Sequence, residues 1–250
     1  MMRLSLPSSF SLPLAALACG SALLAALPVL PARWFKLLIP DDAMVALAGA
    51  DGTVWRGSAQ LALGPPGARR LLPQPVRWQW RAGALELSHP WLRGPVRLQP
   101  GWNGVTVSAQ NLQMPAAVLA AFGAPLNTVA PGGQIEVQWR PFLLGSMPPA
   151  GELGVGRWTQ ASSALSQVRP LGDYRLRASA ADGAIELQLD TEAGVLELTG
   201  SGQVRKGRLQ FQGIAQPAAG ASDAQRAALT GLLGALGPVS DGRSRFGTPR

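Results

Sequence analysis

Alternation of apolar and polar residues runs through most of the chain after residue 50. Tyr174, Leu176 and Ala178 alternate with polar residues, and the pattern resumes after Asp182-Gly183. A period of two is typical of half-exposed β-strands, and Asp-Gly favours a two-residue hairpin turn. The same pattern recurs in residues 54–63, 76–87, 95–107, 135–139, 151–165, 195–204 and 208–215. We therefore predict a mainly β domain, an antiparallel meander with one buried and one solvent-facing side.

Helical spacing appears in three shorter places. We expect a short helix near residues 41–48, capped by Asp41 or Asp42, and a short central helix with Pro115 in its first turn and Gly123 at its end. A third, amphipathic helix begins at Ser222 and carries one apolar stripe, at Leu229, Leu232, Leu233 and Leu236. We predict that this C-terminal helix packs on the buried face of the sheet.

A long uncharged stretch lies near the start of the chain, between Arg3 and Arg33. Residues 10–30 would form a helix about 31 Å long, which matches the apolar core of a bilayer. We therefore predict a transmembrane anchor over residues 10–31, followed by a mostly β domain over residues 32–250. The apolar residues that would face lipid are Phe10, Leu14, Leu17, Leu23, Leu24, Leu27 and Leu30.

Two other interpretations of this stretch involve cleavage. A signal peptide could end at Ala16-Leu17-Ala18, but few apolar residues precede that site. A lipoprotein would use Cys19, but Ala16 stands where the lipidation motif usually has Leu. The length favours an uncleaved anchor, whereas basic residues on both sides of it leave the orientation undecided.

Composition narrows the chemistry. The net charge is +8, but the arginines are scattered along the chain, so no nucleic-acid partner is expected. Cys19 and His89 are the only residues of their kinds, which excludes an intramolecular disulfide and a His/Cys metal site. No phosphate-binding loop, nucleophile elbow or zinc-protease motif is present. We therefore expect neither an enzyme nor a cofactor.

Two other groups of residues are of types that occur in catalytic or binding sites, but simpler structural explanations account for them. Asp173 and Asp182 could form a carboxylate pair, but both occur in turn-forming contexts. Tryptophans interleaved with arginines could stack on bases or sugars, although Trp in strands is mostly packing, with a protein interface or a lipid-facing patch as alternatives. These tryptophans are Trp78, Trp80, Trp91 and Trp102.

Several segments together resemble one known family. Two of them are Phe122 to Trp139 and the C-terminal DGRSRF. Two more, which we call the signature segments, carry residues characteristic of that family. The first contains Gly52, Thr53, Trp55 and Gly57, and the second contains Pro170, Leu171, Gly172 and Tyr174. Their order and spacing resemble type II secretion system protein N over nearly the whole chain. The resemblance implies an inner-membrane protein with residues 1–9 in the cytoplasm and its domain in the periplasm. It also implies accessory work beside other secretion components, the inner-membrane platform and the secretin, and a structural role for the signature residues.

Two functions follow from these observations. A scaffold or coupling protein would dock other components through sheet edges or an exposed arginine face. The alternative is a lipid-binding or lipid-handling envelope protein, because the strand-turn-strand pattern loosely resembles the sheets of AsmA-like proteins. An apolar trough left open by the C-terminal helix would indicate a binder, whereas a closed core and a polar surface would indicate a scaffold. An enzyme would need a pocket at His89 with a carboxylate close by.

Overall fold

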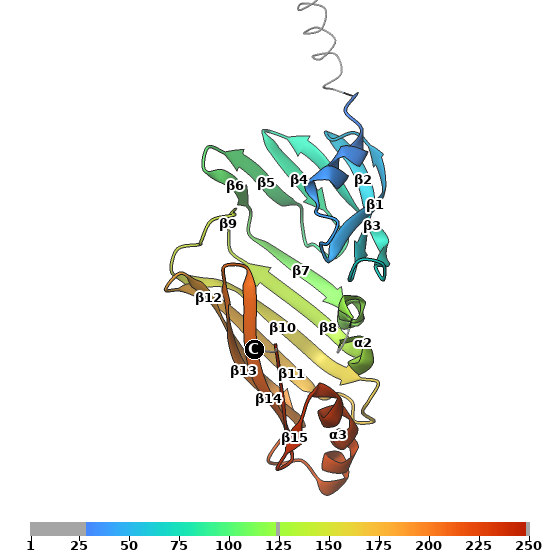
Figure 1. Cartoon of the computed structure of the whole chain (residues 1–250), viewed down its shortest axis with the longest axis vertical. Coiled ribbons are helices and arrows are strands. Elements are labelled where there is room, and N and C mark those ends of the chain that lie inside the picture. Colours follow the sequence, from blue (N-terminus) through green and yellow to red (C-terminus); the bar gives the residue numbers. More distant parts are fainter. Residues whose placement is uncertain (1–28, 124–125, 249–250) are drawn as a thin grey trace, which may run out of the picture.

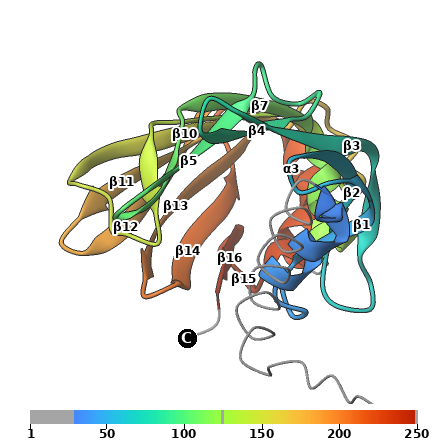
Figure 2. The ribbon, with the colours of Figure 1, turned by 90° about the horizontal axis from the view of Figure 1, so that it is seen from above.

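The structure, a computed structural model, describes residues 29–123 and 126–248. The chain folds into two antiparallel sheets that follow one another along the long axis of the molecule (Figure 1). The predicted mainly β, antiparallel fold is confirmed, but the strands form two sheets instead of one meander. Both sheets curve in the same sense and form an arch with helices on its inner side (Figure 2).

The predicted anchor lies almost entirely outside the described residues. Of its apolar residues, Phe10, Leu14, Leu17, Leu23, Leu24 and Leu27 are outside, and Leu30 is described. Nowhere between residues 29 and 123 or between 126 and 248 is there a helix of the length and apolar character that a membrane crossing requires.

The first sheet has the strand order β1-β2-β3-β4-β5-β6-β9. These strands are β1 (Val45–Gly52), β2 (Arg56–Leu63), β3 (Arg70–Arg81), β4 (Ala84–Ser88), β5 (Val96–Gly101), β6 (Gly104–Val107) and β9 (Phe142–Leu144). The 3-10 helix η2 (Ala32–Leu38) packs on its inner side, where Ala32, Ala59 and Trp78 are buried together. Phe35 of η2 meets Trp78 edge-on, with 5.1 Å between the ring centroids.

The helix predicted near residues 41–48 is wrong. Residues Val45–Gly52 form the edge strand β1, which pairs with β2 in the register Val45 to Leu63 and Leu47 to Leu61. Alanine and leucine favour helix locally, but pairing with β2 and packing against η2 override that preference.

The second sheet has the order β15-β16-β14-β13-β12-β11-β10-β8-β7. Its strands are β7 (Gln110–Pro115), β8 (Pro131–Trp139), β10 (Gly151–Ser163), β11 (Gly172–Ala181), β12 (Ala184–Gly194), β13 (Leu196–Arg205), β14 (Arg208–Pro217), β15 (Val239–Ser240) and β16 (Arg243–Gly247). The predicted hairpin at Asp182-Gly183 is confirmed, since both residues have positive φ and Ala180 pairs with Ile185.

Hydrogen bonds, as well as the chain itself, join the two sheets. The loop between β4 and β5 runs along the outer edge of β7: Arg93 N donates to Asn111 O at 3.1 Å and Gln113 N donates to Trp91 O at 2.7 Å. Trp139 Nε1, at the end of β8, donates to Ser108 O at 3.0 Å. These bonds cover the β7 edge and place the two concave faces in line.

In the described part of the chain, three helices are associated with the second sheet. The predicted central helix is present as the 3-10 helix η3 (Ala116–Phe122), preceded by Pro115 and ended by Gly123, and α2 (Leu126–Val129) follows it. The C-terminal helix α3 (Asp223–Leu236) starts as expected, because Ser222 and Gln225 form a reciprocal capping box. Its buried face, Leu229, Leu232 and Leu233, packs on the inner side of the sheet against Leu171, Leu196 and Ala215.

Candidate functional site

The concave face of the second sheet carries an apolar trough. The cross-strand register places Val137, Gly156, Leu176 and Leu189 in one row across β8, β10, β11 and β12. A cavity of about 530 Å³ lies between this row and α3, and another of about 440 Å³ continues toward β9. The two share Val137, Gly156 and Leu176, and we call them together the trough. Its lining side chains are mainly aliphatic and aromatic, among them Ile135, Val137, Phe142, Leu143, Trp158, Leu176, Ile185, Leu189, Leu198, Leu236 and Phe246.

Glycines on the inner face make room for the trough. A Cβ at Gly156 would lie 3.8 Å from Leu176 Cβ, an ordinary contact, so the missing side chain deepens the floor. Farther along the sheet, Gly200 and Gly202 lie beneath the ring of Phe211, and a Cβ on either would approach that ring to 2.8 or 2.7 Å. The inner side of a strongly curved sheet crowds its side chains, and glycines relieve that crowding.

Helix α3 covers only one end of this face. Leu229, Leu232 and Leu233 close the end that contains Leu171 and Leu196. Beyond it, Leu176 is exposed and Leu189 is half-buried. The expected packing of the C-terminal helix on the sheet is therefore confirmed at the end that contains Leu171 and Leu196, while the rest of the apolar face stays open.

The polar groups beside the trough already have partners. Trp158 Nε1 donates to Gly132 O at 2.9 Å, and Tyr174 Oη donates to Leu196 O at 3.0 Å. Burial raises the pKa of Tyr174 well above its usual range, so its hydroxyl keeps its proton even near pH 10. A ligand in the trough would therefore be held by apolar contact, and its own polar groups would find little there to bond.

The first signature segment lies where the N-terminal segment joins the first sheet. Val54 N donates to Leu30 O at 2.9 Å, Pro31 forms a bridge with Thr53, and Trp78 Nε1 donates to Thr53 O at 3.0 Å. Gly57 is closely packed, since a Cβ there would approach the ring of Trp78 to 2.6 Å. The structure therefore brings Gly52, Thr53, Trp55 and Gly57 together as one turn against η2.

The second signature segment lies at the opposite end of the molecule, under α3. Pro170 follows a cis peptide bond, and Leu171 is buried against α3. Leu171 N donates to Ala161 O at 2.7 Å, and a Cβ at Gly172 would lie 3.0 Å from Tyr174 Oη. This segment therefore holds the start of β11 against the hydrophobic core, which also contains the buried leucines of α3.

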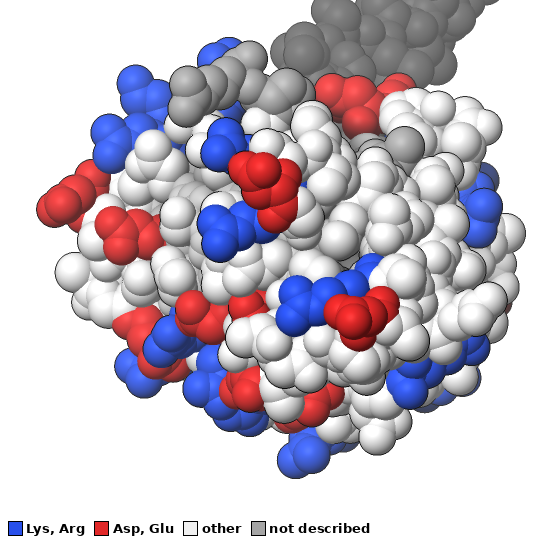
Figure 3. Space-filling view, turned by 90° about the horizontal axis from the view of Figure 1, so that it is seen from below, with Lys and Arg blue, Asp and Glu red and all other residues white. Residues whose placement is uncertain are grey.

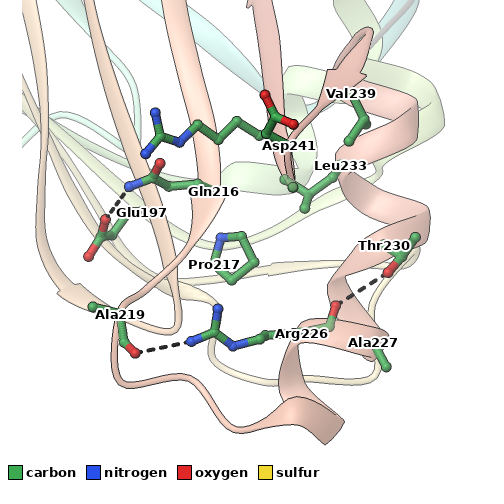
Figure 4. A pocket seen from close by; sticks show the side chains of 12 residues that line it. Glu197, Gln216, Pro217, Ala219, Arg226, Ala227, Thr230, Leu233, Val239 and Asp241 are labelled. Atoms are coloured by element: carbon green, nitrogen blue, oxygen red, sulfur yellow. Dashed lines mark hydrogen bonds between the residues drawn. The ribbon is translucent and has the colours of Figure 1, made fainter.

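A second hollow, of about 570 Å³, lies beside α3 (Figure 4). Several of its polar side chains bond to one another or to the backbone. Arg226 donates to Ala219 O at 3.1 Å and to Ala221 O at 3.0 Å, and Gln216 donates to Glu197 at 2.8 Å. The Arg226 bonds hold the loop before α3 to the helix, and the Gln216 bond joins β14 to β13, so these three side chains have structural roles.

His89 and the aspartates do not converge. The His89 ring accepts from Trp91 N at 3.2 Å and stacks edge-on against Trp91, while its partial burial lowers its pKa. Asp173 lies at the start of β11, where it accepts from Gln160 N at 2.6 Å, and Asp182 lies beyond its other end. Among the described residues, no three His, Cys, Asp or Glu side chains are placed to hold a metal ion.

The convex face of the second sheet is charged. Arg177 pairs with Asp190 at 2.7 Å, and Glu192 pairs with both Arg175 and Arg157. The hydrogen bond from Arg177 lowers the pKa of Asp190. Seen from below, basic and acidic side chains are likewise interspersed over the surface (Figure 3). The exposed arginine face expected from the sequence therefore also carries carboxylates, and Arg157, Arg175 and Arg177 form ion pairs with them.

Sequence reasoning found both signature segments, and it named an open apolar trough as one of two alternatives without deciding between them. The apolar positions of β11 and β12 were visible in the sequence, but which of them α3 leaves uncovered depends on the fold. The glycines of β10 and β13 were the only sequence signal of a hollow, and they are equally typical of turns.

Comparison with known proteins places the chain in a family. The model of the family described as type II secretion system (T2SS), protein N, matches residues 43–247. No curated protein and no solved structure matches the chain. The matched residues contain β1 to β16, and with them both signature segments and the trough. The chain therefore belongs to the type II secretion system protein N family, which implies an accessory role beside the other components of that envelope machine.

Proposed function

We propose that this protein is an accessory scaffold of the type II secretion system, anchored in the inner membrane by residues 10–31. Residues 1–9 lie in the cytoplasm and residues 32–250 in the periplasm. The uncharged run of residues 10–30 and the membership in the protein N family support this arrangement.

The observation that carries the proposal is the junction between the apolar stretch and the first sheet. Leu30 and Pro31 already bond to the turn at Thr53 and Val54, and Phe35 packs on Trp78. No free linker separates residue 30 from the folded body, so the domain would be held at a fixed position on the membrane. The first signature segment, Gly52 to Gly57, would serve this junction.

Contact with other secretion components would use the convex face of the second sheet. Its ion pairs are partly exposed, for example Arg177 with Asp190. Such pairs contribute little to stability but can steer and orient a charged partner. The platform proteins and the secretin are the candidate partners.

Fractionation of the full-length chain tests the anchored topology. We expect the protein to stay in membranes washed with alkaline carbonate, and protease added to spheroplasts to digest residues 32–250. Release by carbonate, or protection of the domain from protease, would contradict the proposal.

A second candidate function, binding of a phospholipid acyl chain, is favoured by the trough. An acyl chain matches its apolar lining and needs no hydrogen bonds, whereas a peptide would bring backbone groups that find few partners there. An open trough is the feature expected of a binder, and acyl-chain binding by the concave face is compatible with a scaffold role for the convex face.

Photolabelling tests this second candidate. The probe is phosphatidylethanolamine with a diazirine on one acyl chain, incorporated in vesicles that carry the full-length chain. Leu176→Arg places a charge in the trough and should reduce labelling of β10 to β12 several-fold. Thr199→Arg, on the exposed convex face, is the matched control and should leave labelling unchanged. Equal labelling of both variants would exclude the trough as the acyl-chain site.

A further inference from the structure

Three hairpin turns and the start of η2 lie at one end of the first sheet, which we call the apex. The turns are residues 53–55 between β1 and β2, 82–83 between β3 and β4, and 102–103 between β5 and β6. The antiparallel order of these strands brings the turns to the same end, and Trp80 N donates to Trp55 O at 2.8 Å between two of them. They form the upper edge of the molecule, where the described chain begins (Figure 1).

Every exposed tryptophan of the chain lies on the apex. The exposed fractions are 50% for Trp34, 40% for Trp55, 38% for Trp80 and 106% for Trp102. The other four of the eight tryptophans are buried or half-buried. Trp55 and Trp80 lie against each other with 6.1 Å between ring centroids, while Trp102 stands at the tip of its hairpin. Large apolar side chains gathered on one exposed surface indicate a binding face.

The charge around these tryptophans is mainly positive. Arg33, Arg56 and Arg81 are exposed beside them, and none of the three forms an ion pair within the described part of the chain. Two carboxylates lie near these turns: Asp51, in β1, accepts a hydrogen bond from Gly52 N at 2.8 Å, and Glu86, in β4, is paired with Arg97. An apolar, aromatic and cationic surface of this kind is complementary to anionic lipid headgroups.

The chain outside the structure identifies the occupant of this surface. Residues 1–28 precede the described chain, and the uncharged run of residues 10–30 leads directly into the apex. Indole rings prefer the interface of a bilayer, where the ring is partly desolvated and its N–H stays wet. The membrane that holds residues 10–31 would therefore meet Trp34, Trp55, Trp80 and Trp102 at headgroup depth.

We propose that the apex rests in the headgroup layer of the membrane that anchors the chain, and so fixes the tilt of the whole domain. This inference depends on the anchored topology proposed above. The long axis of the molecule then stands away from the bilayer, and the second sheet, with its trough and convex face, is presented far from the membrane surface.

Depth-dependent fluorescence quenching tests the proposal with the full-length chain. In a Cys19→Ala background, Asn103→Cys beside Trp102 carries an environment-sensitive fluorophore, and Ala224→Cys on exposed α3 is the matched control. The chain is reconstituted in vesicles of phosphatidylethanolamine and phosphatidylglycerol that contain a lipid with a headgroup quencher. We expect several-fold stronger quenching at position 103 than at position 224, and Trp102→Ser to reduce it.

The outcomes separate the two proposals. If the protein floats with the vesicles but position 103 is quenched no more than position 224, the apex proposal is wrong and the anchored topology stands. If the probe is shielded only after other secretion components are added, the apex is a protein interface and the proposal is also wrong. If the protein does not float with the vesicles, the anchored topology fails first, and the apex proposal fails with it.

Discussion

At the residue scale, Gly57 shows how tightly the first signature segment is packed. A Cβ at this position would approach the ring of Trp78 to 2.6 Å, and both belong to the junction with η2. We expect Gly57→Ala to lower the free energy of unfolding by about 1–3 kcal/mol, because overpacking forces the neighbours apart. Urea unfolding of the detergent-solubilised chain, followed by tryptophan fluorescence, measures this.

The matched control is Gly220→Ala. Nothing lies within 4 Å of the Cβ that this substitution would add, so the stability should hardly change. A Gly57→Ala variant as stable as the Gly220→Ala variant would refute the packing role of the signature glycine.

Tyr174, the single tyrosine of the chain, gives a pH-dependent prediction. Burial raises its pKa in the folded state above the ordinary value of about 10. Its contribution to stability is therefore complete below pH 10 and declines as the pH rises further, because the unfolded chain loses the phenol proton first. We expect phenolate absorbance to appear only as the chain unfolds; phenolate formed near pH 10 with native tryptophan fluorescence would contradict the buried position.

At the scale of elements, α3 divides the concave face into a core and an open trough. Leu232 is 1% exposed and Leu176 is 37% exposed on the same side of the sheet. Leu232→Ala should lower the free energy of unfolding by about 2–5 kcal/mol through the cavity it leaves. Leu176→Ala should cost less, about 1–2 kcal/mol, because this side chain is partly in water and its removal leaves no closed cavity. Equal losses in urea unfolding would mean that the trough is closed in solution.

Local patterns predicted most of these elements. The hairpin at Asp182-Gly183 and the helix capped by Ser222 were visible, because turn chemistry, period and caps act over a few residues. Strand β1 was mistaken for a helix, because its pairing with β2 outweighs the preference of its alanines. The division into two sheets and the pairing of β16 with β14 depend on long-range contacts that no local pattern carries.

At the scale of the whole molecule, the two sheets form one elongated body with different ends. One end carries the exposed tryptophans and the start of the described chain, and the other carries the second signature segment under α3. Bonds between the β4–β5 loop and β7 join the sheets, so a domain fixed at one end would hold the other end at a set distance from the membrane. This arrangement suits an accessory scaffold in an envelope-spanning machine.

The most direct test of this account is photo-crosslinking in native bacterial envelopes during active type II secretion. A photoreactive residue replaces Gln188, which is exposed on the convex face and pairs with Arg177 across β11 and β12. Mass spectrometry of the adducts should identify another component of the type II secretion system. Adducts with phospholipid alone, and none with any secretion component, would contradict the scaffold role.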